Sequence, residues 1–241
     1  MIMLQIGKNN VNSYGKKIHT MPVSAIIPAY NEEGWVGKTV ATLFKIPEIG
    51  EVIVSDDGST DRTCYEAWEA GAIVCRSNFN KGKCQALRNG AYIARGDIFA
   101  FVDADLKETA LEFKKLIQAV QADETDMAIA SFRSGRSAGL GLTKSLGYWG
   151  IRYFTGRKML TPLSGQRVIK RALWDHLNFQ AEGFAAEVEL TIESIQNGFR
   201  VKEIPVCMSH RCGGNNLQSF FHRGQQFMEI FNLIRHRASR L

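Results

Sequence analysis

Two aspartates separated by one residue carry the strongest chemical signal in the sequence. Asp103 and Asp105 follow the apolar run at residues 98–102, so we expect them at the end of a buried strand. Side chains alternate along a strand, which places both carboxylates on one face. Two such charges repel unless a cation or hydrogen-bond donors lie between them. Mg²⁺ and Mn²⁺ suit such oxygen ligands, and substrate phosphates often complete their coordination. The alternative to a metal site is that Asp103 and Asp105 are two solvated acids in a loop, one of which caps the next helix.

The elements that position these aspartates form a repeating pattern of strand, polar turn and helix. The pattern occurs four times, with strands expected at residues 23–28, 51–55, 72–76, 98–102 and 127–130. It predicts an α/β fold in which helices cover both faces of a parallel sheet. The carboxyl ends of parallel strands meet at one edge, where such sheets bind ligands. Polar residues cluster there, at positions 30–32, 56–61, 80–83 and 103–105.

The second half of the chain has a different pattern. We expect a Gly- and Ser-rich loop at residues 134–143, an aromatic short helix or lid at 146–154 and a turn at 161–167. A helix at 184–195 and a strand at 201–206 follow. From residue 217, apolar side chains recur at helical spacing, with arginines between them.

Composition sets limits on the class of protein. The chain has 241 residues, 45% of them hydrophobic and 22% charged, as expected for one globular domain or one with a small appendage. No apolar stretch approaches the ~18 residues of a membrane span, and residues 1–20 have no signal-peptide pattern. Five cysteines without a Cys-x-x-Cys pair indicate reduced thiols in a cytoplasm. The net charge of +6 favours polyanionic partners: nucleotide phosphates, anionic lipid or nucleic acid.

Four motifs together resemble a known family. They are Pro28-Ala29-Tyr30-Asn31-Glu32-Glu33, Asp56-Asp57-Gly58-Ser59-Thr60-Asp61, Lys81-Gly82-Lys83 and Asp103-Ala104-Asp105. Their order and spacing resemble the nucleotide-sugar glycosyltransferases of the GT-A fold, family 2, over roughly residues 22–211. The family includes glucosyl-3-phosphoglycerate synthases and polyprenyl-phosphate sugar synthases. The resemblance implies a Rossmann-like, mostly parallel sheet with an acceptor-side C-terminal extension.

The resemblance implies sugar transfer from a UDP- or GDP-linked donor. The acceptor would be a small phosphorylated or hydroxy-acid molecule, or a polyprenyl phosphate. Asp56 is preferred over Asp57 as acceptor from the base N–H, because the family favours the first of such a pair. Lys83 would meet the phosphates, since a helix start is otherwise a poor place for a cation. The nucleotide sugar is expected to contact Pro28, Ala29, Tyr30, Glu32, Asp56, Lys83, Asp103 and Ala104.

The resemblance also assigns a metal and an acceptor site. Asp105 would bind Mg²⁺ or Mn²⁺ directly, Asp103 would contact the ribose or a metal-bound water, and His210 would be a further ligand. Glu187 is the expected catalytic base, although the usual pair of acids is absent, which leaves the base and the stereochemistry open. The expected acceptor loop contains Gly165, Gln166 and Arg167. The alternatives are that His210 is an ordinary exposed or core histidine, that Glu187 lies on a helix surface and that residues 165–167 form a tight turn.

The chain is thus expected to divide into four segments. These are a loose leader at residues 1–20, a nucleotide-sugar-binding half at 21–131, an acceptor-binding half at 132–212 and a basic amphipathic helix at 213–241. That helix suits an anionic bilayer, its own core or a second copy in a homodimer. The expected location is cytoplasmic, with peripheral contact at the inner membrane face left open.

Two other classes of function remain as alternatives. A nucleotidyltransferase uses a related sheet and acidic pair, but the sequence lacks a glycine-rich N-terminal signature of that class. A non-catalytic nucleotide-sugar sensor or nucleic-acid-binding module is the other. Nucleic acid is not expected as a partner, because acids at the strand ends repel phosphate when no cation is present.

Overall fold

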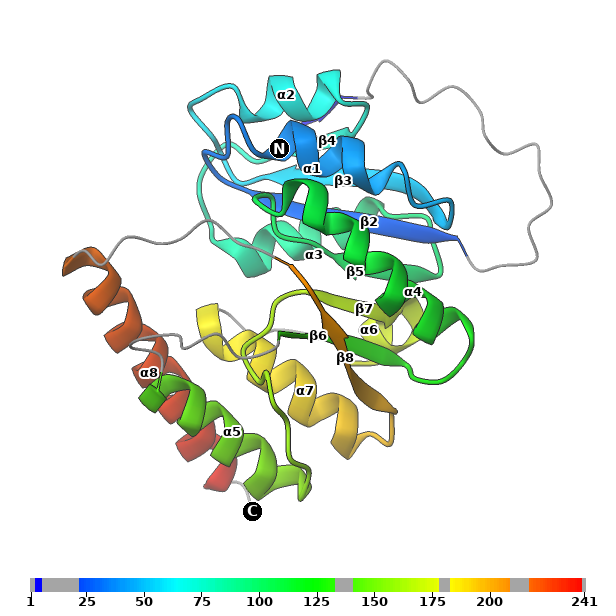
Figure 1. The fold of residues 1–241 in the computed structure, drawn as a ribbon. Coiled ribbons are helices and arrows are strands. Elements are labelled where there is room, and N and C mark those ends of the chain that lie inside the picture. Colours follow the sequence, from blue (N-terminus) through cyan, green and yellow to red (C-terminus); the bar gives the residue numbers. More distant parts are fainter. Residues whose placement is uncertain (1–2, 6–21, 133–140, 178–182, 209–216, 240–241) are drawn as a thin grey trace.

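The predicted strands join in one mixed sheet. In the computed structural model, which describes residues 3–5, 22–132, 141–177, 183–208 and 217–239, eight strands are ordered β1-β4-β3-β2-β5-β7-β6-β8 (Figure 1). The strands are β1 (Met3–Gln5), β2 (Val23–Ala29), β3 (Ile49–Asp56), β4 (Ile73–Arg76), β5 (Ile98–Phe101), β6 (Met127–Phe132), β7 (Arg167–Lys170) and β8 (Val201–Val206).

The first half of the sheet has the predicted parallel arrangement. Strands β4, β3, β2 and β5 run parallel, and helices α1 (Val36–Leu43), α2 (Thr63–Glu69) and α3 (Lys83–Ile93) connect them. The chain moves outward from β2 to β3 and β4, then returns to place β5 on the other side of β2. The order of strands therefore reverses at β2 and β5. Crevices at such reversals bind ligands in open α/β sheets.

An antiparallel strand, β7, departs from the expected pattern. The sequence predicts a turn feeding the apolar pair Val168-Ile169, and the structure inserts this segment between β5 and β6, antiparallel to both. Arg167, the first residue of β7, pairs with Phe101, the last residue of β5. The loop before β7 therefore meets the residues that follow β5. This insertion brings the expected acceptor loop to the aspartates.

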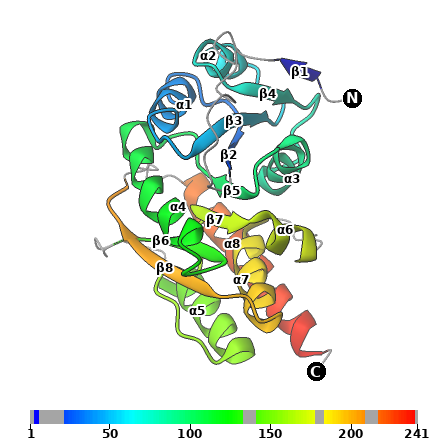
Figure 2. The ribbon, with the colours of Figure 1, turned by 90° about the vertical axis from the view of Figure 1, so that its right-hand side faces the viewer.

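Helices cover both faces of the sheet, as predicted. The remaining helices are η1 (Lys107–Glu112), α4 (Phe113–Gln121), α5 (Gly141–Thr155), α6 (Arg171–Leu177), η2 (Gly183–Ala185), α7 (Ala186–Gln196) and α8 (Leu217–Ala238). Figure 2 shows α1 and α4 on one side of the sheet and α3 and α6 on the other. Helix α5 starts within the expected Gly- and Ser-rich loop, and α6 was not predicted. No helix in the described ranges has the length and hydropathy needed to cross a membrane.

The core has two layers, one on each face of the sheet. One layer joins the sheet to α1, α2 and α4, and the other joins it to α3, α5, α6, α7 and α8. Close packing of α3 depends on Gly90, where an added Cβ would lie 2.5 Å from Ile26 Cγ2 of β2. The missing side chain lets α3 lie tightly on β2. This contact holds α3, whose first turn carries Lys83, against β2.

Candidate active site

A pocket of about 290 Å³ opens at the carboxyl ends of β2, β3 and β5. It lies at the reversal in strand order, where a ligand site is expected from topology. The lining includes seven of the eight residues predicted to contact a nucleotide sugar, together with Asp105. The lining residues are Pro28, Ala29, Tyr30, Glu32, Asp57, Lys83, Ala86, Asp103, Ala104 and Asp105.

Asp56 and Asp57 have different positions from those expected. Asp56 is fully buried, accepts hydrogen bonds from the Ser59 N–H at 3.2 and 3.3 Å and lies 3.5 Å from Arg76 Nε. It is not among the pocket-lining residues. Asp57 lines the pocket, and its carboxylate accepts from the backbone N–H groups of Lys81 at 2.9 Å and Gly82 at 2.6 Å. The alternation of side chains at a strand end indicates that these neighbours face opposite ways, but it does not say which of them faces the pocket.

Lys83 contacts the first of the two central aspartates. Its Nζ lies 2.7 Å from Asp103 Oδ1, and the lysine side chain is 41% exposed. Partial removal from water lowers the pKa of Lys83, but the Asp103 and Glu187 carboxylates more than offset this and raise it. The ammonium group is therefore firmly charged at the start of α3. The helix dipole disfavours a positive charge at the start of a helix, and these two carboxylates compensate for that effect at Lys83.

Gln166 holds the backbone of the aspartate pair. Its Oε1 accepts a hydrogen bond from the Asp103 N–H at 3.0 Å, and its own C=O accepts from the Ala130 N–H at 2.9 Å. The side chain is buried, and its Nε2 has no hydrogen-bond partner among the described residues. A buried amide donor without a partner is costly unless a ligand completes it. Sequence reasoning placed Gln166 near an acceptor but did not predict its bond to Asp103.

Gly165 brings Lys83 and Glu187 together. A Cβ built on Gly165 would lie 2.7 Å from Lys83 Nζ and 3.4 Å from Glu187 Oε1. Both charged groups therefore press against the loop before β7, as only a glycine permits at this distance. Burial raises the pKa of Glu187, and the positive charges of Lys83 and Arg167 oppose this rise only in part. A carboxyl group with a raised pKa is a better proton acceptor near neutral pH.

Arg167 does not face the pocket. Its side chain is 1% exposed, and its guanidinium donates to the Ser164 C=O at 2.8 Å, to Thr191 Oγ1 at 3.0 Å and to the Glu187 C=O at 2.8 Å. Burial lowers its pKa to about 10. The expected contact of Arg167 with the acceptor is therefore wrong. As the first residue of β7, Arg167 lies between the sheet and α7, where it fixes the loop and the first turn of that helix.

The donor set of the pocket fits a hard divalent cation. The residues lining it in the described part of the chain include four carboxylates, from Glu32, Asp57, Asp103 and Asp105, and one ammonium group. No three His, Cys, Asp or Glu side chains of the described residues gather closely enough to hold an ion by themselves. One or two carboxylates plus substrate phosphates suffice for Mg²⁺ or Mn²⁺. The predicted ligand His210 lies outside the described residues.

Two curated proteins show clear sequence similarity. The chain is 31% identical to the low-salt glycan biosynthesis hexosyltransferase of Haloferax volcanii over 209 residues, which cover 82% of this chain and 50% of that protein. It is 30% identical to the dodecaprenyl-phosphate galacturonate synthase of Rhizobium johnstonii over 150 residues, 58% of this chain and 44% of that one. The chain thus spans about half the length of these relatives.

A solved structure shows the same fold. Glucosyl-3-phosphoglycerate synthase from Mycobacterium tuberculosis, in complex with Mn²⁺, UDP-glucose and phosphoglyceric acid, superposes with a TM-score of 0.74 at 23% identity. The match covers 89% of this chain and 79% of that one. It confirms the GT-A fold predicted from the sequence. The family model for glycosyl transferase family 2 matches residues 24–175, more than half of the chain. The chain therefore belongs to glycosyl transferase family 2.

Proposed function

We propose that the protein transfers a hexose from a UDP- or GDP-linked donor to an acceptor held beside the loop at Gly165. One observation carries the proposal: the pocket at the carboxyl ends of the strands contains two aspartates and a lysine, and Gly165 brings the half-buried Glu187 close to that lysine. The aspartates, through a metal ion, and the lysine would bind the diphosphate of the donor. The glutamate would take the proton of an acceptor hydroxyl. The Haloferax hexosyltransferase supports the reaction class.

The nucleotide would lie against the end of β2. Pro28, Ala29 and Tyr30 line that side of the pocket, and their backbone groups would read the edge of a base. We assign the base N–H to Asp57 in place of Asp56, because only Asp57 lines the pocket. Binding of UDP-glucose by the Mycobacterium tuberculosis protein of the same fold supports a uridine donor.

Asp105 would hold the metal, with Asp103 beside it and His210 as a further ligand. The carboxylates of the pocket are the donor type that Mg²⁺ and Mn²⁺ prefer. When bound, the ion would supply positive charge that stabilises the leaving nucleoside diphosphate. Lys83 adds a second positive charge from the start of α3, and its bond to Asp103 keeps its Nζ inside the pocket.

Glu187 would take the proton from an acceptor hydroxyl. Its raised pKa suits a general base, and its Oε1 lies close to Gly165 on the acceptor side. Arg167 donates to the backbone C=O of Glu187. Arg167 would therefore be a positioning residue that holds Glu187 in place. We assign Gln166 Nε2 to a hydroxyl of the donor sugar or the acceptor, because this buried donor has no protein partner among the described residues.

Two acceptor classes fit this arrangement. A small phosphorylated hydroxy acid is supported by the phosphoglyceric acid bound to the Mycobacterium tuberculosis protein, and a polyprenyl phosphate by the dodecaprenyl-phosphate synthase of Rhizobium. The partition of the product between water and organic solvent separates the two classes. A cytoplasmic location and a homodimer stay predictions.

The reaction is tested by supplying UDP- and GDP-hexoses with Mn²⁺, phosphoglycerate and a polyprenyl phosphate. We expect release of a nucleoside diphosphate that chelation of the metal abolishes and that Asp105→Asn abolishes. Asp175→Asn, an exposed aspartate on α6, is the matched control and should retain activity. Release of pyrophosphate would indicate a nucleotidyltransferase instead, and full turnover without divalent metal would contradict the proposed site.

A further inference from the structure

The outer face of α5 carries an exposed pair of stacked aromatic rings. Trp149 is 50% exposed and Tyr153 is 57% exposed, with ring centroids 5.1 Å apart and planes 19° from parallel. Arg152 is also exposed and, three residues after Trp149, lies next to Trp149 on the helix surface. The two rings thus form a contiguous exposed aromatic pair, which is more informative than a single exposed ring.

The loop that follows α5 adds further exposed side chains. Arg157 and Lys158 are exposed, and Leu160 is 73% exposed. The carboxylate of Glu203 on β8 holds the loop by accepting from the Leu160 N–H at 2.8 and 2.9 Å and from the Thr161 N–H at 2.6 Å. The backbone is thus fixed while the leucine side chain projects into solvent. We call the six residues Trp149, Arg152, Tyr153, Arg157, Lys158 and Leu160 the α5 surface.

The segment of chain that contains the α5 surface is rich in basic residues, and the structure places an acidic group, Glu203 of β8, beside it at Leu160. Between Asp126 and Asp175 the sequence contains no acidic residue, whereas it contains nine lysines and arginines. The basic groups of the α5 surface therefore have no acidic neighbour within their own segment of chain. Such a surface attracts an anionic partner.

The inner side of α5 packs against the acceptor side of the active site. A Cβ on Gly147 would lie 3.3 Å from Leu163 Cδ2 and 3.4 Å from Val188 Cγ2, which are ordinary to tight packing distances. Leu163 precedes the loop at Gly165, and Val188 follows Glu187 on α7. Figure 1 shows α5 and α7 side by side in the same part of the molecule, with α8 next to α5. One helix therefore connects the α5 surface to the acceptor side.

We propose that the α5 surface binds the interface of an anionic lipid bilayer. Tryptophan and tyrosine favour the headgroup level of a bilayer, and lysine and arginine are attracted to its anionic lipids. The exposed aliphatic Leu160 suits an acyl-chain boundary and offers nothing to a nucleic acid. This surface is distinct from the C-terminal helix, for which the sequence had suggested membrane contact. If the proposed sugar transfer holds, the acceptor that fits this surface is a lipid phosphate.

Co-sedimentation of the full chain with vesicles tests the proposal. We expect binding to vesicles of phosphatidylcholine and phosphatidylglycerol and little binding to phosphatidylcholine alone. Arg152→Glu with Lys158→Glu should weaken binding at least about fivefold, the effect of losing one basic contact. Trp149→Ala with Tyr153→Ala should weaken it to a similar degree. Matched controls are Lys114→Glu on α4 and Tyr92→Ala on α3, both exposed and remote, which should bind as the parent protein does.

Three outcomes would overturn the proposal: no vesicle binding, equal binding to neutral and anionic vesicles, or unchanged binding of both double variants. A dimer that Trp149→Ala with Tyr153→Ala dissociates, without vesicle binding, would assign the surface to a second copy and would also overturn it. Circular dichroism confirms that each variant is folded. Sugar transfer is measured separately, so loss of transfer with intact vesicle binding contradicts only the proposed function, and the reverse contradicts only the α5 surface.

Discussion

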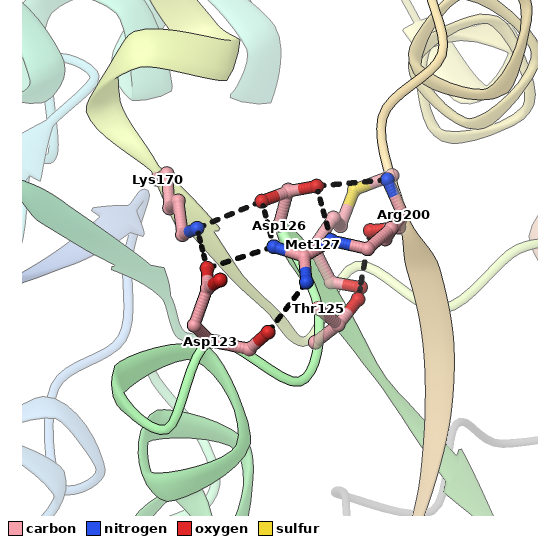
Figure 3. A network of polar contacts seen from close by, with 6 residues as sticks. All are labelled: Asp123, Thr125, Asp126, Met127, Lys170 and Arg200. Carbon is pink, nitrogen blue, oxygen red and sulfur yellow. Dashed lines mark hydrogen bonds and ion pairs between the residues drawn. The ribbon is translucent and has the colours of Figure 1, made fainter.

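Two pairs of aspartates lie at opposite edges of the same sheet and have opposite surroundings. Asp103 and Asp105 follow β5 at its carboxyl end, whereas Asp123 and Asp126 precede β6 at its amino end. The first pair lines a pocket that contains four carboxylates and one ammonium group among its described residues. The second pair, shown in Figure 3, meets one lysine and one arginine.

The second pair forms a closed network. Lys170 contacts both aspartates, at 2.8 Å for Asp126, and Arg200 Nη2 contacts Asp123 at 2.7 Å and Asp126 at 2.9 Å (Figure 3). The Arg200 C=O accepts from the N–H groups of Asp126 and Met127. The network joins the turn before β6, the end of β7 and the start of β8. Its two negative charges meet two positive ones without any ligand.

This difference separates a structural cluster from a binding site. The amino-end network meets its own counterions, so its geometry is complete within the protein. The carboxyl-end pocket holds an excess of acids around one lysine, as expected where a cation and a diphosphate bind. Substitutions in the two places should therefore affect different properties: activity in the pocket and stability in the network.

The largest expected effect is loss of activity in Asp105→Ala. If Asp105 holds the metal, kcat should fall about 10²- to 10³-fold, because positive charge at the leaving group is lost. The free energy of unfolding should change little, since the pocket is open to solvent. Nucleoside diphosphate release and urea unfolding measure the two quantities. If Asp105→Ala instead lost activity because it unfolded, the pocket would be a structural cluster like the network of Asp123 and Asp126, and the comparison would fail.

Asp126→Ala should have the opposite profile. It removes partners of Lys170 and Arg200 and a hydrogen bond from the Arg200 N–H, so we expect a loss of about 1–3 kcal/mol in the free energy of unfolding. The kcat should remain within about twofold of the parent value, because the network lies at the other edge of the sheet. Glu124→Ala, whose side chain makes an exposed pair with Lys202, is the matched control and should cost less.

Gly165→Ala should impair activity while leaving the fold intact. The added methyl group would lie 2.7 Å from Lys83 Nζ, the flexible end of a long side chain that can move away. Displacement of Lys83 and crowding of Glu187 should lower kcat/KM about tenfold, a typical cost for a small misplacement of reacting groups. Gly50→Ala is the control, because nothing lies closer than 3.9 Å to its added Cβ. Equal activity of the two variants would contradict the roles of Lys83 and Glu187.

The smallest expected effect is a pH dependence of stability that arises from Asp126. Hydrogen bonds from the Arg200 side chain and from Lys170 lower its pKa from the ordinary value of 3.8, although burial acts the other way. A carboxyl with a lowered pKa stabilises the fold above its unfolded-state pKa, and this contribution is lost as the pH falls through its folded-state pKa.

The unfolding temperature of the parent protein should therefore fall more steeply below about pH 4 than that of Asp126→Asn, whose amide does not titrate. Thermal unfolding monitored by circular dichroism over an acidic pH series measures both proteins. Parallel curves would show that Asp126 contributes nothing to acid sensitivity and that the network is weaker than its distances suggest.

The sequence by itself determined the fold class, the family and the edge of the sheet that carries the site. Strand and helix periods have a local cause, and the carboxyl ends of parallel strands must meet at one edge. The order of strands and turns along the chain is therefore enough to assign Asp103, Asp105, Lys83 and Tyr30 to one place. These residues line the pocket together.

Only the tertiary structure decided which side of each element faces that place. It separated Asp57 from Asp56, turned Arg167 into the interior, and joined Gln166 to the Asp103 N–H. The outcomes for Arg167 and Gln166 depend on the antiparallel insertion of β7 beside β5, a pairing between segments more than sixty residues apart. Local patterns specify an element and its period, whereas the burial of a charged side chain depends on the partner that packs over it.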